Sequence, residues 1–114
     1  ISQISLIDTI NSLPKMKSLD ISNCGIMNLE NINPANKIQY LYLAGNHLNN
    51  IEILDNFPNL LYADLSNNPI NKISELKKCT SLKELKLDGT ALNSKDILIG
   101  KEGYWGLKKR FSKP

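Results

Sequence analysis

One pattern of apolar residues recurs every 22 residues in this chain, and the period restricts the fold more than any other feature of the sequence. The clearest copy spans Ile38–Leu54 and reads IQYLYLAGNHLNNIEIL, with apolar residues first at alternate positions and then at every third position. One period earlier the pattern starts at Met16, and later copies start at Leu60 and Leu82. Four copies share one register over residues 16–92 without an insertion, which predicts a single domain of stacked, similar units.

Each copy is predicted to contribute one short strand. In the second copy Leu41 and Leu43 alternate with other residues, and alternation sends successive side chains to opposite faces of a strand. A single copy cannot bury its own apolar side, so the strands must lie parallel and next to one another. The spacing of Leu48, Ile51 and Leu54 fits an extended or 3₁₀ segment rather than a full α-helix, and we expect such a segment behind the sheet.

Asparagine marks the point where the chain leaves a strand. Asn46 and Asn68 occupy equivalent positions, and a side-chain amide there can bond to backbone groups of the turn and its neighbours. Cys24 and Thr90 hold the same position in the outer copies, where we expect weaker bonding. The turns are expected to be tight because each of three copies places a glycine beside this position: Gly25, Gly45 and Gly89.

With these motifs, residues 4–92 resemble the leucine-rich repeat family. The period is similar to that of its 22-residue class, which includes regulatory subunits of protein phosphatase 1, an axonemal dynein light chain and the bacterial internalins. The resemblance implies an α/β solenoid with a short parallel sheet on the concave face and an extended or 3₁₀ convex side. Because these relatives work by binding other macromolecules, it also implies a noncatalytic module that binds a protein partner on the concave face.

The two ends of the chain depart from the four repeats. Residues 1–15 have two interpretations with the same apolar positions: the back half of a partial repeat, which we favour, or a capping helix that starts at Ser5, with Asp8 completing a capping box. Residues 93–114 lose the register and predict a C-terminal cap followed by a basic tail. We expect a short helix after Asn93 and cover of the last repeat by aromatic and apolar side chains such as Trp105.

Aromatic and charged residues gather at the outward positions of the strands. Tyr40, Tyr42 and Tyr62 fall at such positions on neighbouring strands, about 4.8 Å apart. Exposed tyrosines are typical of protein interfaces, although tyrosine also stabilises strands through cross-strand contacts. We predict a partner-binding surface composed of Tyr40, Tyr42, Tyr62, Asp20, Asp64, Glu84 and Lys86.

No sequence feature points to catalysis. Asp20 and Asp64 would lie two strands apart, about 10 Å, on an open surface, without the coupling and desolvation that a catalytic carboxylate pair needs. The single histidine, His47, falls in a turn and has no partners for a triad or a metal site. The sequence also lacks a glycine-rich phosphate loop. We therefore expect no enzyme activity, no catalytic residue, no cofactor and no metal.

The positive charge of the chain is concentrated in the tail. The net charge is +3, but residues 95–114 hold six Lys or Arg and two Asp or Glu, so the repeats are nearly neutral. Basic residues around Trp105 and Phe111 give a first alternative function, binding to nucleic acid or another acidic surface. We place it second to protein binding because such contacts would be weak and salt-sensitive. Another alternative is a secreted bacterial adhesin or effector resembling the internalins.

The two cysteines predict a reducing compartment. Cys24 and Cys79 hold different positions in copies two periods apart, so we expect no disulfide and two buried thiols. This favours a cytoplasmic protein, and we expect a monomer. No apolar run approaches the about 20 residues of a membrane span, and no signal peptide is visible. Because the sequence starts in mid-repeat without an initiator methionine, we expect a trimmed or processed product.

Overall fold

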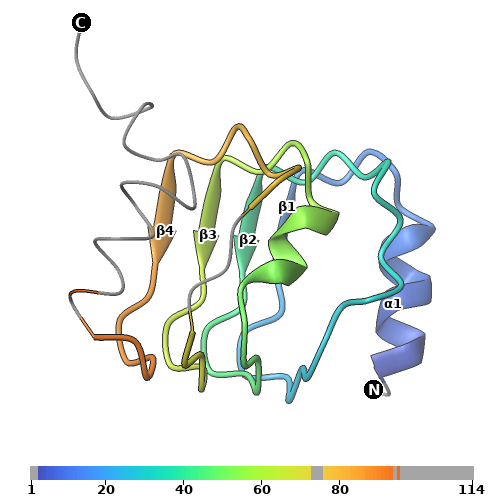
Figure 1. Cartoon of the computed structure of the whole chain (residues 1–114). Coiled ribbons are helices and arrows are strands. Elements are labelled where there is room, and N and C mark those ends of the chain that lie inside the picture. Colours follow the sequence, from blue (N-terminus) through green and yellow to red (C-terminus); the bar gives the residue numbers. More distant parts are fainter. Residues whose placement is uncertain (1–2, 73–75, 94, 96–114) are drawn as a thin grey trace, which may run out of the picture.

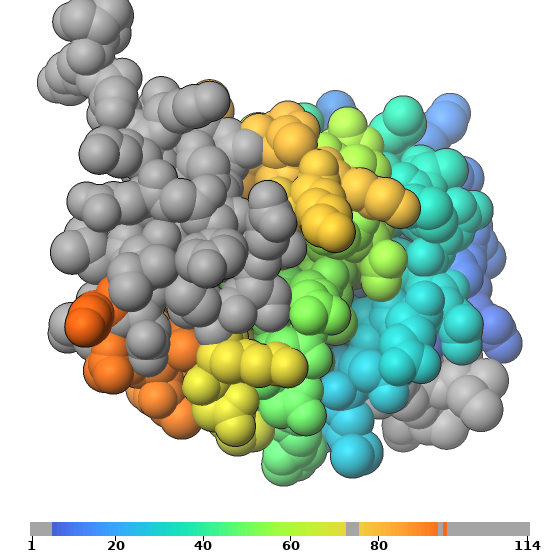
Figure 2. Space-filling model, in the orientation of Figure 1, coloured from blue at the N-terminus to red at the C-terminus, as the bar shows by residue number. Residues whose placement is uncertain are grey.

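The computed structural model describes residues 3–72, 76–93 and 95. In this part of the chain the helices and strands are α1 (Gln3–Asn11), β1 (Ser18–Asp20), β2 (Tyr40–Tyr42), the 3₁₀ helix η1 (Glu52–Asn56), β3 (Tyr62–Asp64) and β4 (Glu84–Lys86). Figure 1 shows the four strands side by side in chain order, with α1 at the end of the sheet next to β1. The space-filling view in Figure 2 shows the same order as successive colour bands across the surface.

The four strands form one parallel sheet in the order β1-β2-β3-β4. The central residue of each strand pairs with the residue one period away: Leu19 with Leu41, Leu41 with Ala63 and Ala63 with Leu85. The prediction of one parallel strand per copy is therefore confirmed. The three equivalent positions of the strands form three straight rows across the sheet.

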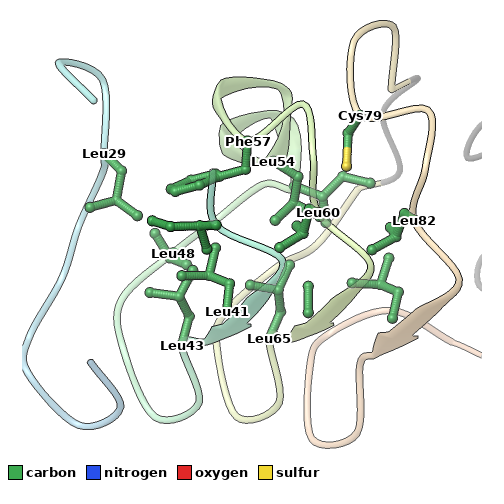
Figure 3. Packing of buried hydrophobic residues seen from close by; sticks show 14 of the residues in the cluster. Leu29, Leu41, Leu43, Leu48, Leu54, Phe57, Leu60, Leu65, Cys79 and Leu82 are labelled. Carbon is green, nitrogen blue, oxygen red and sulfur yellow. The ribbon is translucent and has the colours of Figure 1, made fainter. Parts of the chain in front are cut away.

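The core lies between the sheet and the segments behind it. The inward residue of β2, Leu41, is fully buried, as are Leu54 of η1 and Phe57, which follows η1. Figure 3 shows these side chains packed together with leucines of the neighbouring copies. Burial of apolar area at about 25 cal/mol per Å² makes this layer the main source of stability. The 3₁₀ segment expected behind the sheet is present as η1 in the second copy.

Asn46 joins the first two copies inside the core, as the sequence predicted. Its Oδ1 accepts hydrogen bonds from the backbone N–H groups of Cys24 (3.0 Å) and Ile26 (2.9 Å). Its Nδ2 donates to the carbonyl oxygens of Ile21 (3.0 Å) and Leu43 (2.9 Å). The amide therefore satisfies four backbone groups that would otherwise be costly to bury.

Asn68 repeats this arrangement one period later. Its Oδ1 accepts from the N–H of Leu48 (3.0 Å), and its Nδ2 donates to the carbonyl oxygens of Leu43 (2.9 Å) and Leu65 (3.0 Å). At the equivalent position of the last copy, the Thr90 hydroxyl donates to the carbonyl oxygen of Leu87 (2.8 Å), within its own turn. Asparagine is suited to this position because it combines an acceptor and two donors on one short side chain.

The turn after each strand places an equivalent residue in the left-handed region, and Gly25 adds a second one in the first turn (φ 70°). The φ values are 56° at Asn23, 71° at Gly45, 57° at Asn67 and 71° at Gly89. These four residues are one period apart, so asparagine and glycine alternate at one position of the repeat. Both residue types tolerate this conformation better than other L-residues do.

The N-terminal segment combines the two interpretations that the sequence left open. It is helical as α1, and its buried residues Ile7 and Ile10 lie one period before the buried residues Leu29 and Ile32. The helix thus occupies the place that the back half of a repeat would take. The predicted helix start is wrong, because α1 already includes Gln3 and Ser5 lies inside it.

Asn11, the last residue of α1, attaches the helix to the first copy. Its Nδ2 donates to the carbonyl oxygen of Asn31 (2.9 Å), and its Oδ1 accepts from the N–H of Asn33 (2.8 Å). Two periods later, Asp55 accepts in the same way from the N–H of Lys77 (3.1 Å). Asn11 and Asp55, at equivalent positions two periods apart, therefore each hydrogen-bond to the backbone one period further along the chain.

The cysteine prediction is correct for one residue and wrong for the other. Cys79 is buried, but Cys24 is exposed, and the two do not form a disulfide. Cys24 lies in the turn of the first copy, where its Sγ donates to the carbonyl oxygen of Ser22 (3.3 Å). The predicted C-terminal helix and the aromatic cover around Trp105 lie outside the described residues.

In the described part of the chain, neither the length nor the apolar character of any helix suffices to cross a lipid bilayer.

Candidate functional site

The exposed side of the sheet presents two straight rows of side chains. The outer residues of each strand are more exposed than its central residue, so they point away from the core. We call these eight positions the tyrosine face: Ser18, Tyr40, Tyr62 and Glu84 in one row, and Asp20, Tyr42, Asp64 and Lys86 in the other. All seven residues that the sequence proposed for binding belong to these two rows.

The three tyrosines occupy the two central strands. Tyr40 pairs with Tyr62 in one row, and its side chain is 42% exposed. Tyr42 and Tyr62 lie diagonally across β2 and β3, with ring centroids 5.4 Å apart and ring planes inclined by 46°. Tilted aromatic pairs at this separation attract each other beyond simple area burial. The contact places the two rings side by side on the outward side of the sheet.

The carboxylate of Asp20 is held by hydrogen bonds from Ser22, two residues further along the chain. Its Oδ1 accepts from the backbone N–H of Ser22 (3.0 Å) and from the Ser22 hydroxyl (2.8 Å). These bonds, the backbone bond first, lower the pKa of Asp20 below its ordinary value of 3.8. Asp64 is held similarly, because its Oδ1 accepts from the N–H of Ser66 (3.0 Å).

Lys86 interacts with Tyr62 across the last two strands. Charge interaction with Tyr62 and a hydrogen bond to it raise the pKa of the Lys86 ammonium above its ordinary value of 10.5. The carboxylates of Asp64 and Glu84 add smaller contributions in the same direction. The only ammonium among the eight positions is therefore already engaged by its neighbours on the tyrosine face.

The two aspartate carboxylates of the tyrosine face do not lie close together. Asp20 and Asp64 are separated by strand β2, which places their backbones about 10 Å apart. Within the described residues, no three His, Cys, Asp or Glu side chains gather closely enough to hold a metal ion. The tyrosine face combines apolar ring area, hydroxyl groups and carboxylates on a rigid sheet. Such a surface can recognise a macromolecule by shape, hydrogen bonding and charge.

The sequence missed the serines that position the carboxylates. Ser22 and Ser66 follow Asp20 and Asp64 by two residues, a spacing at which aspartate commonly bonds to the backbone ahead of it. The Asp-x-Ser motif was visible in both copies and could have predicted these bonds. The Tyr42 and Tyr62 contact was predicted only as proximity, because ring orientation depends on side-chain rotamers.

A groove of about 510 Å³ lies outside the tyrosine face, between the back segments of the first two copies. It is lined by Met27, Asn28, Glu30, Leu48, Asn49, Asn50, Glu52, Ile53 and Asn56. Several of these amides are used in turns: Asn50 Oδ1 accepts from the N–H of Glu52 (3.0 Å), and Asn56 Nδ2 donates to the carbonyl oxygen of Leu29 (3.1 Å). The groove is thus built largely from groups that shape the back of the repeats.

Comparison with known proteins supports the repeat pattern directly. Residues 37–60, which include β2 and η1, match the family model described as Leucine Rich Repeat. A search of curated proteins and a search of solved structures each returned no significant match.

Proposed function

We propose that this chain is a leucine-rich repeat protein, since residues 37–60 match that family model, and that it is a noncatalytic module that binds a protein partner through the tyrosine face. Leucine-rich repeats generally mediate protein–protein interaction. The observation that carries the proposal is the group of three tyrosines on β2 and β3, with Tyr40 exposed and the Tyr42 and Tyr62 rings in contact. Tyrosine is enriched at interfaces because a rigid ring offers much contact area and loses little entropy on binding.

The competing explanation is that the tyrosines only stabilise their strands. The inward residues Leu41 and Ala63 already anchor β2 and β3 in the core. Strand stability would be served equally by β-branched residues at the outward positions. Three neighbouring tyrosines surrounded by charged groups instead match the composition of an interface, with an aromatic centre and a polar rim.

Two further parts of the proposal follow the sequence. We propose that the protein is a monomer and acts in the cytoplasm, since Cys24 and Cys79 do not form a disulfide. The nucleic-acid alternative depends on the basic tail, which lies outside the described residues. Carboxylates at Asp20, Asp64 and Glu84 make the tyrosine face itself unfavourable for phosphate.

The test places a photo-reactive benzoylphenylalanine at one position at a time and captures partners from a lysate of the source organism. One chain carries it in place of Tyr40 on the tyrosine face, and a matched control carries it in place of Met27, which is 67% exposed outside that face. We expect crosslinks from position 40 that persist above about 0.2 M salt and are lost in the Tyr42→Ala/Tyr62→Ala variant.

Crosslinking from position 27 alone would contradict the proposal by moving the interface away from the sheet. Capture that disappears entirely above about 0.2 M salt would instead favour the basic tail as the binding element.

A further inference from the structure

We infer that the partner bound at the tyrosine face presents basic side chains, arginine above all, to the Asp20, Tyr42 and Asp64 row. This inference rests on the proposed function, because it assigns the chemistry of the partner that the face is proposed to bind. The partner that covers the exposed sheet is thus a basic segment of a protein.

The first support is the distribution of charge. The whole chain carries a net charge of +3. The eight positions of the tyrosine face carry the opposite sign, with carboxylates at Asp20, Asp64 and Glu84 against one ammonium at Lys86. Charge complementarity steers partners and excludes those of like charge. The face therefore selects a cationic partner, although the chain as a whole is basic.

The second support is the order of residues along one row. Asp20, Tyr42 and Asp64 lie on consecutive strands, so an aromatic ring stands between two carboxylates at steps of about 4.8 Å. A guanidinium group can stack on a tyrosine ring while its N–H groups bond to a carboxylate beside it. Arginine uses both contacts because its donors lie in the plane of the group.

The third support is that the carboxylates are held in place before any partner arrives. Ser22 fixes Asp20 through two hydrogen bonds, and Ser66 fixes Asp64 through its backbone N–H. In all three bonds the acceptor is Oδ1, and a carboxylate has acceptor capacity for further donors. Fixed acceptors lower the entropic cost of binding a cationic side chain.

The fourth support is an intramolecular example at the far end of the same row. The Lys86 ammonium is stabilised by Tyr62, with smaller contributions from Asp64 and Glu84. In the strand register Lys86 pairs with Asp64, so a cation already lies beside a carboxylate of this face. It offsets one of the two carboxylates on β3 and β4, and Asp20 and Tyr42 on β1 and β2 lie at the opposite end of the row from this cation.

The test titrates the isotope-labelled full chain with the peptide acetyl-Gly-Arg-Gly-Arg-Gly-amide and follows its resonances by NMR. The matched peptide replaces arginine by citrulline, which keeps the shape of the side chain and removes its charge. We expect the arginine peptide to shift resonances of Asp20 and Tyr42, and the citrulline peptide to bind about tenfold more weakly.

Two charge-matched variants separate the face from the overall charge. Asp20→Asn/Asp64→Asn should weaken the arginine peptide about tenfold. Glu30→Gln/Glu52→Gln removes two exposed carboxylates outside the face and should leave affinity within about twofold, since these groups lie away from the sheet. Dispersion of the amide resonances reports whether each variant is folded.

Equal binding of the citrulline peptide, or equal weakening by both variant pairs, would overturn the inference. So would shifts of the tyrosine face that grow with protein concentration before peptide is added, because they would assign the face to a second copy of this chain. In these cases a salt-resistant crosslink from position 40 would still uphold protein binding. Absence of that crosslink would instead remove the proposed function itself.

Discussion

The side chain of Asn23 lies directly over the α-carbon of Gly45, one period further along the chain. A β-carbon on Gly45 would fall against Oδ1 and Cγ of Asn23, and Asn67 has the same relation to Gly89. The alternation of asparagine and glycine in the turns is therefore a packing requirement as well as a backbone preference. Each asparagine needs a following copy that has no β-carbon at this position.

Gly45→Ala should destabilise the fold by about 2 kcal/mol, because alanine is strained at positive φ and its methyl group meets Asn23. Asn23→Gly alone should have a small effect, since glycine accepts the same conformation. Chemical denaturation of the two single variants and the double variant would measure the coupling. Strict additivity would show that backbone strain, not the contact with Asn23, sets the cost.

Asn46→Ala should cost about 3 kcal/mol or more, because four backbone groups lose their partner in the core. Asn49→Ala, three residues along and exposed, is the matched control and should change stability by less than about 0.5 kcal/mol. Thermal unfolding would compare the two variants. A similar small loss for both would mean that water replaces the amide of Asn46.

Leu43→Ala should destabilise the protein by about 2 to 5 kcal/mol, since it opens a cavity at a fully buried position. Tyr42→Ala, at the neighbouring outward position, should cost about 1 kcal/mol through loss of the contact with Tyr62. Urea unfolding distinguishes the two outcomes. Comparable losses would contradict the assignment of inward and outward faces.

The Asp20 carboxyl should titrate below pH 3.8, because its bonds with Ser22 favour the ionised form. These bonds stabilise the folded state above the ordinary pKa, and the contribution is lost as the pH falls through the folded-state pKa. Ser22→Ala removes the hydroxyl and keeps the backbone N–H, so the midpoint should rise part of the way. NMR titration of the side-chain carboxyl measures it, and an unchanged midpoint would assign the whole effect to the backbone bond.

The sheet and the tyrosine face could be predicted from the sequence because the four copies share one register. Because side chains alternate along a strand and copies repeat at a constant interval, the row containing Asp20, Tyr42, Asp64 and Lys86 follows from the sequence alone. The hydrogen bonds of Asn46 follow for the same reason. These features depend on spacing, which the sequence states directly.

Other features could not be predicted because one spacing of apolar residues fits more than one local structure. Ile7 and Ile10 are three residues apart, which fits both a helical face and the back of a repeat, so the pattern could not choose α1. Phe57 does not belong to the apolar positions of the repeat pattern. It is part of the core because η1, the short helix that it follows, turns its ring inward. Cys24 is exposed although the equivalent Asn46 is buried, because β1 is the edge strand of the sheet and no strand turn covers that side of the first copy in the described residues.

The hydrogen bonds of Asn46 and Asn68 give this chain a simple rule for changing length. Each amide joins its own turn to the copy before it, across sequence separations of 20 to 25 residues. Duplication of one whole 22-residue unit within the gene would therefore supply both halves of every such bond, while loss of a single codon would misalign the bonds that span the deletion. Evolution can lengthen or shorten this protein in whole units and so adjust the extent of its exposed sheet.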